Sequence, residues 1–176
     1  MSVHKLTARK FVGAFALAAV VFGGAALAQS NSPFGGFRHD ETQPIEIAAD
    51  SLEVQEAQGI VIFTGDVDAG QGTLRLTSSK LTVTYGDGGA GSGEINKMRA
   101  EGSVFIANGA ETASGDWAEY NVAGGVITMG GAVTLTQGGN VVKGGSLKIN
   151  LNTGQGAVDG AGGRVKSVFT PAKKTD

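Results

Sequence analysis

An internal repeat constrains the fold of this 176-residue chain more than any other feature. Residues 60–85 read IVIFTGDVDAGQGTLRLTSSKLTVTY, and a shift of 66 positions without a gap places Gly65 on Gly131. A shift of 37 places Gly65 on Gly102 instead. The three glycines are thus 37 and 29 residues apart, and the longer interval contains a Gly-rich insert at 86–93. The basic unit is therefore about 29 residues, a length typical of architectures whose units bury their apolar faces against each other.

Apolar residues alternate with polar residues inside each copy, which is the two-residue period of a β-strand. The stretch 147–151, Leu-Lys-Ile-Asn-Leu, shows it most clearly. Residues 60–63 are apolar throughout, but their equivalents at 126–129 have Thr128 in place of Ile62, so Ile62 faces outward. Short strands separated by turn signals predict an all-β fold of repeated antiparallel strands, with a sandwich, a barrel or a solenoid as the possibilities.

The strands are expected to be separated by glycine turns, and we expect no helix outside the first 28 residues. Asn108-Gly109, Gly138-Gly139 and Gly144-Gly145 are assigned to tight hairpins because glycine supplies the positive φ angles that such turns require. The predicted strands lie near residues 45–55, 59–69, 73–85, 95–106, 111–121, 125–136, 140–151 and 155–169.

The superposed copies also predict which side chains face the interior. This predicted interior is mostly aliphatic and only modestly bulky. Its main members are Leu52, Val54, Val61, Phe63, Val67, Leu76, Leu81, Val83, Val104, Ile106, Ile127, Met129, Val133, Leu135, Leu147 and Ile149, and Ile47, Met98, Tyr120 and Val142 share the same phase.

The first 28 residues have the pattern of a cleavable export signal. Lys5, Arg9 and Lys10 precede an apolar run from 11 to 28 that ends in Ala-Leu-Ala, a small-x-small cleavage site. An uncleaved membrane anchor is the alternative, but it would need roughly 20 apolar residues with fewer glycines and no cleavage motif.

The remainder is predicted to form one domain with irregular ends. Residues 29–43 lack periodicity and are expected to be a mobile lead-in, 44–171 form the β domain, and 172–176 are a tail. About 148 residues suffice for one hydrophobic core. Cysteine is absent, so the fold must be stable without disulfides.

The charge balance excludes nucleic acid as a partner. The export signal contains three of the 14 basic residues and none of the 16 acidic ones, which leaves 11 basic against 16 acidic and a formal charge of −5. A protein that binds the phosphate backbone of nucleic acids needs a basic surface. Outside the export signal, the only basic cluster in the sequence is Lys173-Lys174 at the end of the chain.

Residues 86–91, Gly-Asp-Gly-Gly-Ala-Gly, fit the dinucleotide-binding pattern G-x-G-x-x-G. That motif needs a helix whose N-terminus receives the pyrophosphate, whereas here the sequence leads into another strand. The stretch is therefore read as a hairpin loop.

No set of residues forms a recognisable catalytic or metal site. The carboxylates of Asp50, Asp66, Asp68, Asp87, Asp116 and Glu119 could be combined in pairs, but nothing in their spacing requires it. His39 is the only histidine after the export signal. Nucleophilic triads and zinc sites thus lack parts, and we expect no enzyme activity, no metal and no cofactor. Trp117 is predicted to face outward, where packing and a partner contact both remain open.

The chain resembles the LptA (OstA-like) family of periplasmic lipopolysaccharide-transport proteins over residues 44–171. The resemblance is carried by motifs that are weak singly and fairly specific in this order: Ile45-x-Ile-x-Ala-Asp50, Phe63-Thr-Gly-Asp-Val67 with Gln71-Gly72 after it, Ala100-Glu-Gly-Ser-Val104, residues 115–120 followed by Gly131-x-Val133, and Gly163-Arg-Val-Lys-Ser-Val-Phe-Thr-Pro171. The insert at 86–93 departs from the family pattern.

The resemblance implies an open β-jellyroll in the periplasm that carries lipopolysaccharide from the inner to the outer membrane. The interior residues named above would bind the lipid A portion. Residues 45–54 would receive an LptC-like inner-membrane jellyroll, and residues 164–170 would receive an LptD-like outer-membrane receptor or the next copy in a head-to-tail chain. The implied partner-binding edge residues are Ile45, Ile47, Val165, Val168 and Phe169.

Two other function classes fit parts of the sequence. One is a structural or adhesive β-scaffold of the cell envelope, whose interior would be a filled core. The other is an enzyme acting on polysaccharide, which would need clustered acids or an aromatic platform that this sequence lacks. Co-purification with acylated glycolipid separates these alternatives from lipid transport.

Overall fold

A computed structural model describes Phe37, Asp40 and residues 42–87, 89–90 and 93–170. The chain divides into two compact units, residues 1–30 and 31–176. Only the second unit contains described residues, so the predicted export signal and the tail at 172–176 lie outside them.

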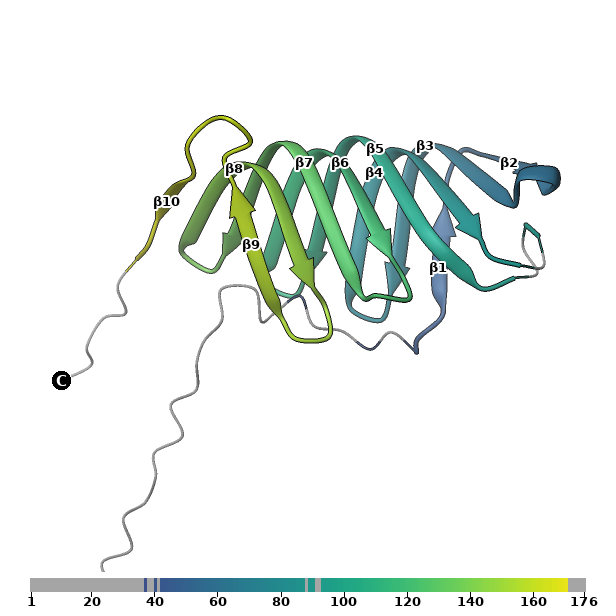
Figure 1. Ribbon diagram of the computed structural model, residues 1–176, viewed down its shortest axis with the longest axis horizontal. Helices are drawn as coiled ribbons and strands as arrows, with labels where there is room; N and C mark the ends of the chain where they lie inside the picture. The colour runs from purple at the N-terminus through teal and green to yellow at the C-terminus, as the bar shows by residue number, and fades with distance from the viewer. Residues whose placement is uncertain (1–36, 38–39, 41, 88, 91–92, 171–176) are drawn as a thin grey trace, which may run out of the picture. The chain divides into compact units, whose positions relative to one another are not determined.

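The described residues form strands, with 3-10 helix at Phe37 and in one short turn, which confirms the predicted all-β class (Figure 1). Two predicted strands are each divided, because 45–55 and 155–169 contain two strands apiece. The elements are β1 (Ile45–Ala48), β2 (Ser51–Gln55), η2 (Glu56–Gln58), β3 (Ile60–Gln71), β4 (Leu74–Tyr85), β5 (Ile95–Asn108), β6 (Glu111–Asn121), β7 (Val126–Gln137), β8 (Asn140–Asn150), β9 (Gln155–Asp159) and β10 (Lys166–Val168).

All strand pairs are antiparallel, and strands β3 to β8 pair in the order of the sequence. At one end of the sheet, β1 and β2 both pair with β3, and at the other end β9 and β10 both pair with β8. Each long strand therefore belongs to two half-sheets. We call them the β2/β9 half-sheet and the β1/β10 half-sheet after their edge strands, and together they form the open jellyroll seen in Figure 1.

A line of β-bulges separates the two half-sheets. The pairing register shifts near the middle of every hairpin from β3–β4 to β7–β8. Gly65, Gly102 and Gly131, the glycines that mark the sequence repeat, lie at these shifts with φ angles of 83°, 81° and 90°. A bulge with a left-handed glycine bends a strand strongly, so the repeat encodes one bend in every second strand.

Side chains from neighbouring segments crowd these bends. A Cβ atom at Gly65 would clash with the carboxylate of Asp50, and one at Gly131 would clash with that of Asp116. A Cβ at Gly102 would lie 2.9 Å from Oγ of Ser79. Glycine is thus required at the bends for its φ angle and for the lack of space.

The structure confirms two of the predicted glycine turns and corrects a third. Gly109 and Gly138 lie in hairpin turns with φ of 59° and 55°. Gly144-Gly145 does not form a turn, because both residues lie inside β8. A Cβ at Gly144 would lie 2.8 Å from the backbone oxygen of Asp159, so these glycines allow the end of β9 to lie close over β8.

The Gly-rich insert joins β4 to β5 as a loop. Its ends are tied by a hydrogen bond of 2.8 Å from the backbone N–H of Gly86 to the carbonyl of Glu94. Strand β5 follows directly, so no helix is placed to receive a pyrophosphate. The interpretation of this stretch as a hairpin loop is confirmed.

Candidate functional site

The interior lies between the two half-sheets and is built from ladders of directly paired residues. On the β2/β9 half-sheet, both inward ladders are apolar apart from the Tyr120 hydroxyl. The ladder nearer the bend contains Leu52, Phe63, Leu81, Ala100, Ala118, Met129, Leu147 and Val158. The ladder farther from it contains Val54, Val61, Val83, Met98, Tyr120, Ile127, Ile149 and Gly156.

The β1/β10 half-sheet has one apolar and one mixed ladder. Its apolar ladder lies nearer the bend and contains Ile47, Ala69, Leu76, Ile106, Ala113, Leu135 and Val142. Farther from the bend, beside the hairpin turns, lies a second row that we call the polar rim. It contains Ile45, Gln71, Leu74, Asn108, Glu111, Gln137 and Asn140.

Most of the side chains predicted to face the interior are buried in one core cluster. Phe63 and Leu76 are half-buried at its margin. The fully buried members of the prediction are Val61, Val67, Leu81, Val83, Val104, Ile106, Ile127, Met129, Val133, Leu135, Leu147 and Ile149.

Leu52 and Val54 depart from that prediction, because 58% and 49% of their surfaces are exposed. They lie opposite Phe63 and Val61, so they belong to the inner face as expected. However, β2 is an edge strand that pairs only with β3, and no further strand of this chain covers it among the described residues. The sequence pattern gives the face correctly but not the burial.

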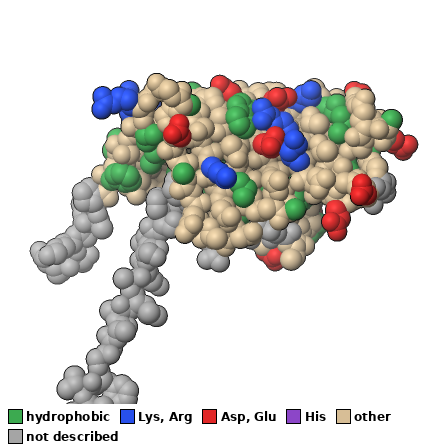
Figure 2. Space-filling view, viewed as in Figure 1, with side chains coloured by type: hydrophobic (Ala, Val, Ile, Leu, Met, Phe, Trp, Pro, Cys, Tyr) green, Lys and Arg blue, Asp and Glu red, His purple; other side chains and the backbone are tan. Residues whose placement is uncertain are grey.

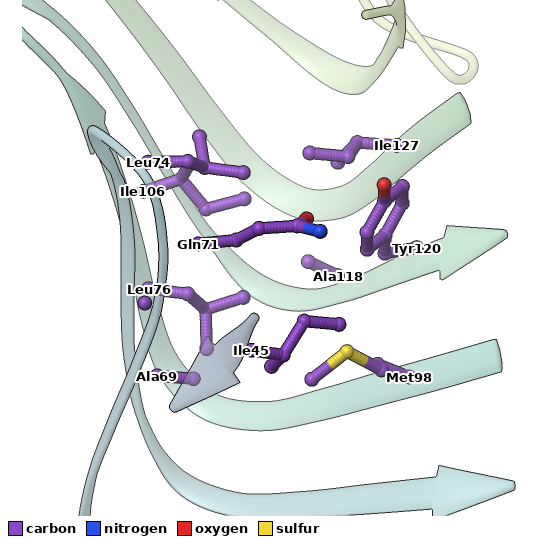
Figure 3. Close-up of a pocket in the computed structure, with 11 residues that line it drawn as sticks. Ile45, Ala69, Gln71, Leu74, Leu76, Met98, Ile106, Ala118, Tyr120 and Ile127 are labelled. Carbon is purple, nitrogen blue, oxygen red and sulfur yellow. The ribbon is translucent and has the colours of Figure 1, made fainter. Parts of the chain in front are cut away.

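A small cavity of about 40 Å³ lies between the half-sheets near β1. Figure 3 shows Leu74, Leu76 and Ile106 on one side, Ala118, Tyr120 and Ile127 on the other, and the Gln71 side chain reaching between them. A space of this size holds only a few water-sized molecules. An acyl chain is much larger than this space, so it could enter here only if the half-sheets moved apart.

Several interior residues were not found by sequence reasoning, among them the buried Ala69, Ala100, Ala113, Ala118 and Leu151. Phe37 belongs to the predicted mobile lead-in, yet its side chain is fully buried in the core cluster. A single aromatic residue in a polar stretch gives no periodic signal, although its size favours burial. The polar rim was also missed. Its one signal in the sequence is that Gln71 and Gln137 occupy equivalent positions when the repeat is shifted by 66 residues.

The outer face of the β2/β9 half-sheet contains a mixed charge cluster around Trp117. Arg99 lies over the Trp117 ring and also lies 3.8 Å from a Glu119 oxygen, which is 3.6 Å from Nζ of Lys97. The half-buried Trp117 ring lies against Gly130, where a Cβ atom would clash with it. Figure 2 shows basic and acidic side chains intermixed on the face in view, not gathered in a patch of one sign.

The predicted partner-binding residues lie at the two ends of the sheet. Ile45 and Ile47 belong to edge strand β1, where both pack against the core. Val168 belongs to edge strand β10 and is 66% exposed, and Val165 and Phe169 flank that strand and are also exposed.

The structure also shows where the carboxylates, the possible metal ligands and the helical segments lie. Asp50 and Asp116 lie against different bend glycines, so they form no pair. Among the described residues, no three His, Asp or Glu side chains are grouped to hold a metal ion. None of the described helical segments is long and apolar enough to span a membrane. His39 lies outside the described residues.

Comparison with known proteins identifies relatives of the whole domain. A family model for the "LptA/(LptD N-terminal domain) LPS transport protein" matches residues 46–155. An uncharacterised protein of Rhizobium meliloti (strain 1021) is 35% identical over 167 residues, which is 91% of this chain and 90% of that protein. The LPS-assembly protein LptD of Neisseria gonorrhoeae is 29% identical over 136 residues, which is 60% of this chain but only 17% of that protein.

A solved structure shares the fold. It is the crystal structure of LptH, the LptA homologous periplasmic component of the lipopolysaccharide transport device of Pseudomonas aeruginosa. The similarity has a TM-score of 0.66 at 22% identity and covers 75% of this chain and 99% of the other. The family match, which covers more than half of the chain, shows that this chain belongs to the LptA/(LptD N-terminal domain) family of LPS transport proteins.

Proposed function

We propose that this protein is a periplasmic bridge that binds lipopolysaccharide and carries it from the inner to the outer membrane. The observation that carries the proposal is the continuity of the two inward ladders of the β2/β9 half-sheet, which run from edge strand β2 to edge strand β9 with only the Tyr120 hydroxyl as a polar group. Acyl chains lying along these ladders would be shielded from water. At each end of the domain, a neighbouring jellyroll could extend the ladders and keep the chains covered.

Lipid transfer between membranes needs such shielding. Each buried CH₂ group is worth about 0.8 kcal/mol, so a lipid with several acyl chains is held out of water by tens of kcal/mol. The half-sheets are joined along the bends and have no ladder hydrogen bonds to each other elsewhere among the described residues. Acyl chains would therefore enter by separating the half-sheets and replacing the side-chain contacts between them.

The proposed end-to-end assembly agrees with the strand directions. Each half-sheet has eight segments, running from β1 or β2 through β3–β8 to β10 or β9, and neighbouring segments are antiparallel throughout. With an even number of segments, the first and last run in opposite directions. Placing β10 beside β1 of the next copy, and β9 beside β2, would then continue both half-sheets as antiparallel pairs, which is strand addition at exposed edges.

We assign a different partner to each end of the domain. An LptC-like jellyroll of the inner membrane would pair with β1 and β2, and an LptD-like receptor or another copy would pair with β9 and β10. The junction is heterologous, so it can extend without closing into a ring. The exposed Leu52 and Val54 would be covered there, which gives a reason for two large apolar side chains at an edge.

The small size of the cavity between the half-sheets favours one competing function, a structural or adhesive β-scaffold that binds no lipid. The cavity of about 40 Å³ is what such a scaffold would have. The two functions differ in whether lipid reaches the interior face.

Photo-crosslinking during lipopolysaccharide transport tests the proposal. A photoreactive amino acid at Phe63 or Leu76, which are inward and half-buried, should label with lipopolysaccharide, whereas one at Thr82 or Lys148 on the outward phase should not. Phe63 and Leu76 are chosen over fully buried positions because they tolerate a larger side chain with less disturbance.

The control is the ratio of inward to outward labelling, measured on the same folded protein with matched expression. Labelling confined to inward positions supports the transport function. Equal labelling of both sets, or none at any position with lipid present, would favour the scaffold instead.

A further inference from the structure

The polar rim distinguishes the two sides of the interior. Four of its neighbouring members, Asn108, Glu111, Gln137 and Asn140, are cross-strand partners on three successive pairs, so their side chains lie abreast beside the β5–β6 and β7–β8 turns. Asn108 and Glu111 are each only 6% exposed. Amides and a carboxylate thus line one margin of an otherwise apolar interior.

The opposite margin is apolar. The strand ends of the β2/β9 half-sheet that lie beside the other set of turns carry Tyr85, Val122 and Leu151, and these side chains pack against the core cluster. A ligand lying between the half-sheets would meet amides and a carboxylate along one margin only, because the polar groups named near the other are the hydroxyls of Tyr85 and Tyr120. The interior is therefore asymmetric across its width.

Glu111 has an unused acceptor in this rim. Its Oε1 accepts a hydrogen bond from Nε2 of Gln137. Its Oε2 is buried and has no hydrogen-bond partner among the described residues, and none of their ion pairs involves this carboxylate. A buried carboxylate oxygen without a hydrogen-bond donor is unfavourable, so a ligand that supplies a donor stabilises the site.

We propose that the polar rim binds the uncharged, hydroxyl-rich part of the lipid's headgroup, with a ligand hydroxyl donating to Oε2 of Glu111. The amides of Asn108 and Gln137 flank this carboxylate and can donate to or accept from further hydroxyls. The inference rests on the proposed function, because it requires the acyl chains to lie in the interior. Beyond the proposed function, the inference states which margin of the interior receives the headgroup, and this fixes the orientation of the bound lipid.

The chemistry of the rim selects hydroxyls over phosphate. A carboxylate accepts hydrogen bonds but repels a phosphate, and the rim contains no Lys or Arg to offset that repulsion. Phosphate groups of the same headgroup would therefore lie away from Glu111.

Two amphiphiles with the same twelve-carbon chain test this assignment, dodecyl maltoside and dodecylphosphocholine, both used below their micellar concentrations. We expect the full chain to bind dodecyl maltoside about tenfold more tightly by calorimetry, since one hydrogen bond to a charged group contributes about this factor. Glu111→Gln and Glu111→Ala should each remove that preference by weakening maltoside binding alone. Glu101→Gln, on the outer face beside Arg99, is the matched control and should change neither affinity.

Each outcome separates the headgroup site from the lipid-binding function. If both amphiphiles bind the wild-type chain equally, or if both Glu111 variants keep the maltoside preference, the rim assignment is wrong while lipid binding stands. If neither amphiphile nor lipopolysaccharide binds, the proposed function fails and the rim assignment fails with it. Glu111→Gln keeps the shape of the side chain, so it remains informative if Glu111→Ala does not fold.

Discussion

The guanidinium carbon of Arg99 lies 4.1 Å from the centroid of the Trp117 ring, on the outer face of the β2/β9 half-sheet. Such a cation–π contact contributes about 0.5–1 kcal/mol at a partly exposed site. We expect a double-mutant cycle of Arg99→Gln and Trp117→Leu, measured by urea unfolding, to give a coupling energy of about this size. Lys97→Gln serves as the control, since Lys97 pairs with Glu119 but not with the ring; a coupling of zero for Arg99 would mean that the stack contributes nothing.

Gly131→Ala should destabilise the domain more than Gly138→Ala. Both glycines have positive φ, 90° and 55°, so both substitutions carry a conformational cost of about 1 kcal/mol. Only the Cβ at Gly131 meets another group, the Asp116 carboxylate, whereas the space around Gly138 is open. Thermal or urea unfolding of the two variants measures the difference, and equal losses would show that crowding at the bend is unimportant.

A charge in the interior should prevent stable folding, whereas the same charge one residue later should not. Leu147 is 1% exposed in the core, and Lys148 faces outward. Leu147→Asp buries an unpaired carboxylate at a cost on the order of 5 kcal/mol, a large part of a domain's stability. Lys148→Asp should stay within about 0.5 kcal/mol of wild type by urea unfolding. Similar losses at both sites would contradict the assigned phase.

Phe37→Ala should cost about 3 kcal/mol of unfolding free energy, because it removes a fully buried aromatic side chain. Phe105→Ala is the matched control, since Phe105 is 42% exposed on the outer face of β5 and its loss should cost less than about 1 kcal/mol. Urea unfolding monitored by Trp117 fluorescence measures both. If Phe37→Ala has no effect, the lead-in does not belong to the core in solution.

Removing residues 164–176 should leave a folded domain whose self-association is weaker but not abolished. The truncation deletes edge strand β10, yet β9 stays paired with β8 and remains available at the same end. Sedimentation velocity over a range of concentrations measures the change. Undiminished association of the truncated chain would exclude β10 from the junction.

Most of the strands could be predicted from the sequence because each copy of the repeat confirms the phase of the others. Thr128, for example, indicates that its equivalent, Ile62, faces outward. The predicted strands 59–69, 95–106 and 125–136 contain Gly65, Gly102 and Gly131, but the pattern could not show that the sheet bends at these glycines. A glycine inside a strand pattern does not by itself reveal a positive φ angle or the bulge that goes with it.

The remaining differences arise from tertiary context. Leu52 and Val54 have the periodicity of interior residues, but exposure at an edge depends on which strand comes next in space. Phe37 is buried, but it lies in a stretch without hydrophobic periodicity, so the sequence pattern does not predict its burial. Glu111 reads as an ordinary residue after a turn, and only the pairing of β5, β6 and β7 places it between two amides inside the domain.

Every strand from β3 to β8 pairs with its neighbours in sequence, and each connection between them is a hairpin. The chain therefore forms its native sheet without closing any long loop, so its contact order is low for an all-β protein. Low contact order favours rapid folding, and a fold with repeated nearest-neighbour pairing can begin at any hairpin and extend in both directions. A chain that presents its residues progressively could thus add one strand at a time to a growing sheet, and would always have an edge ready for the next strand.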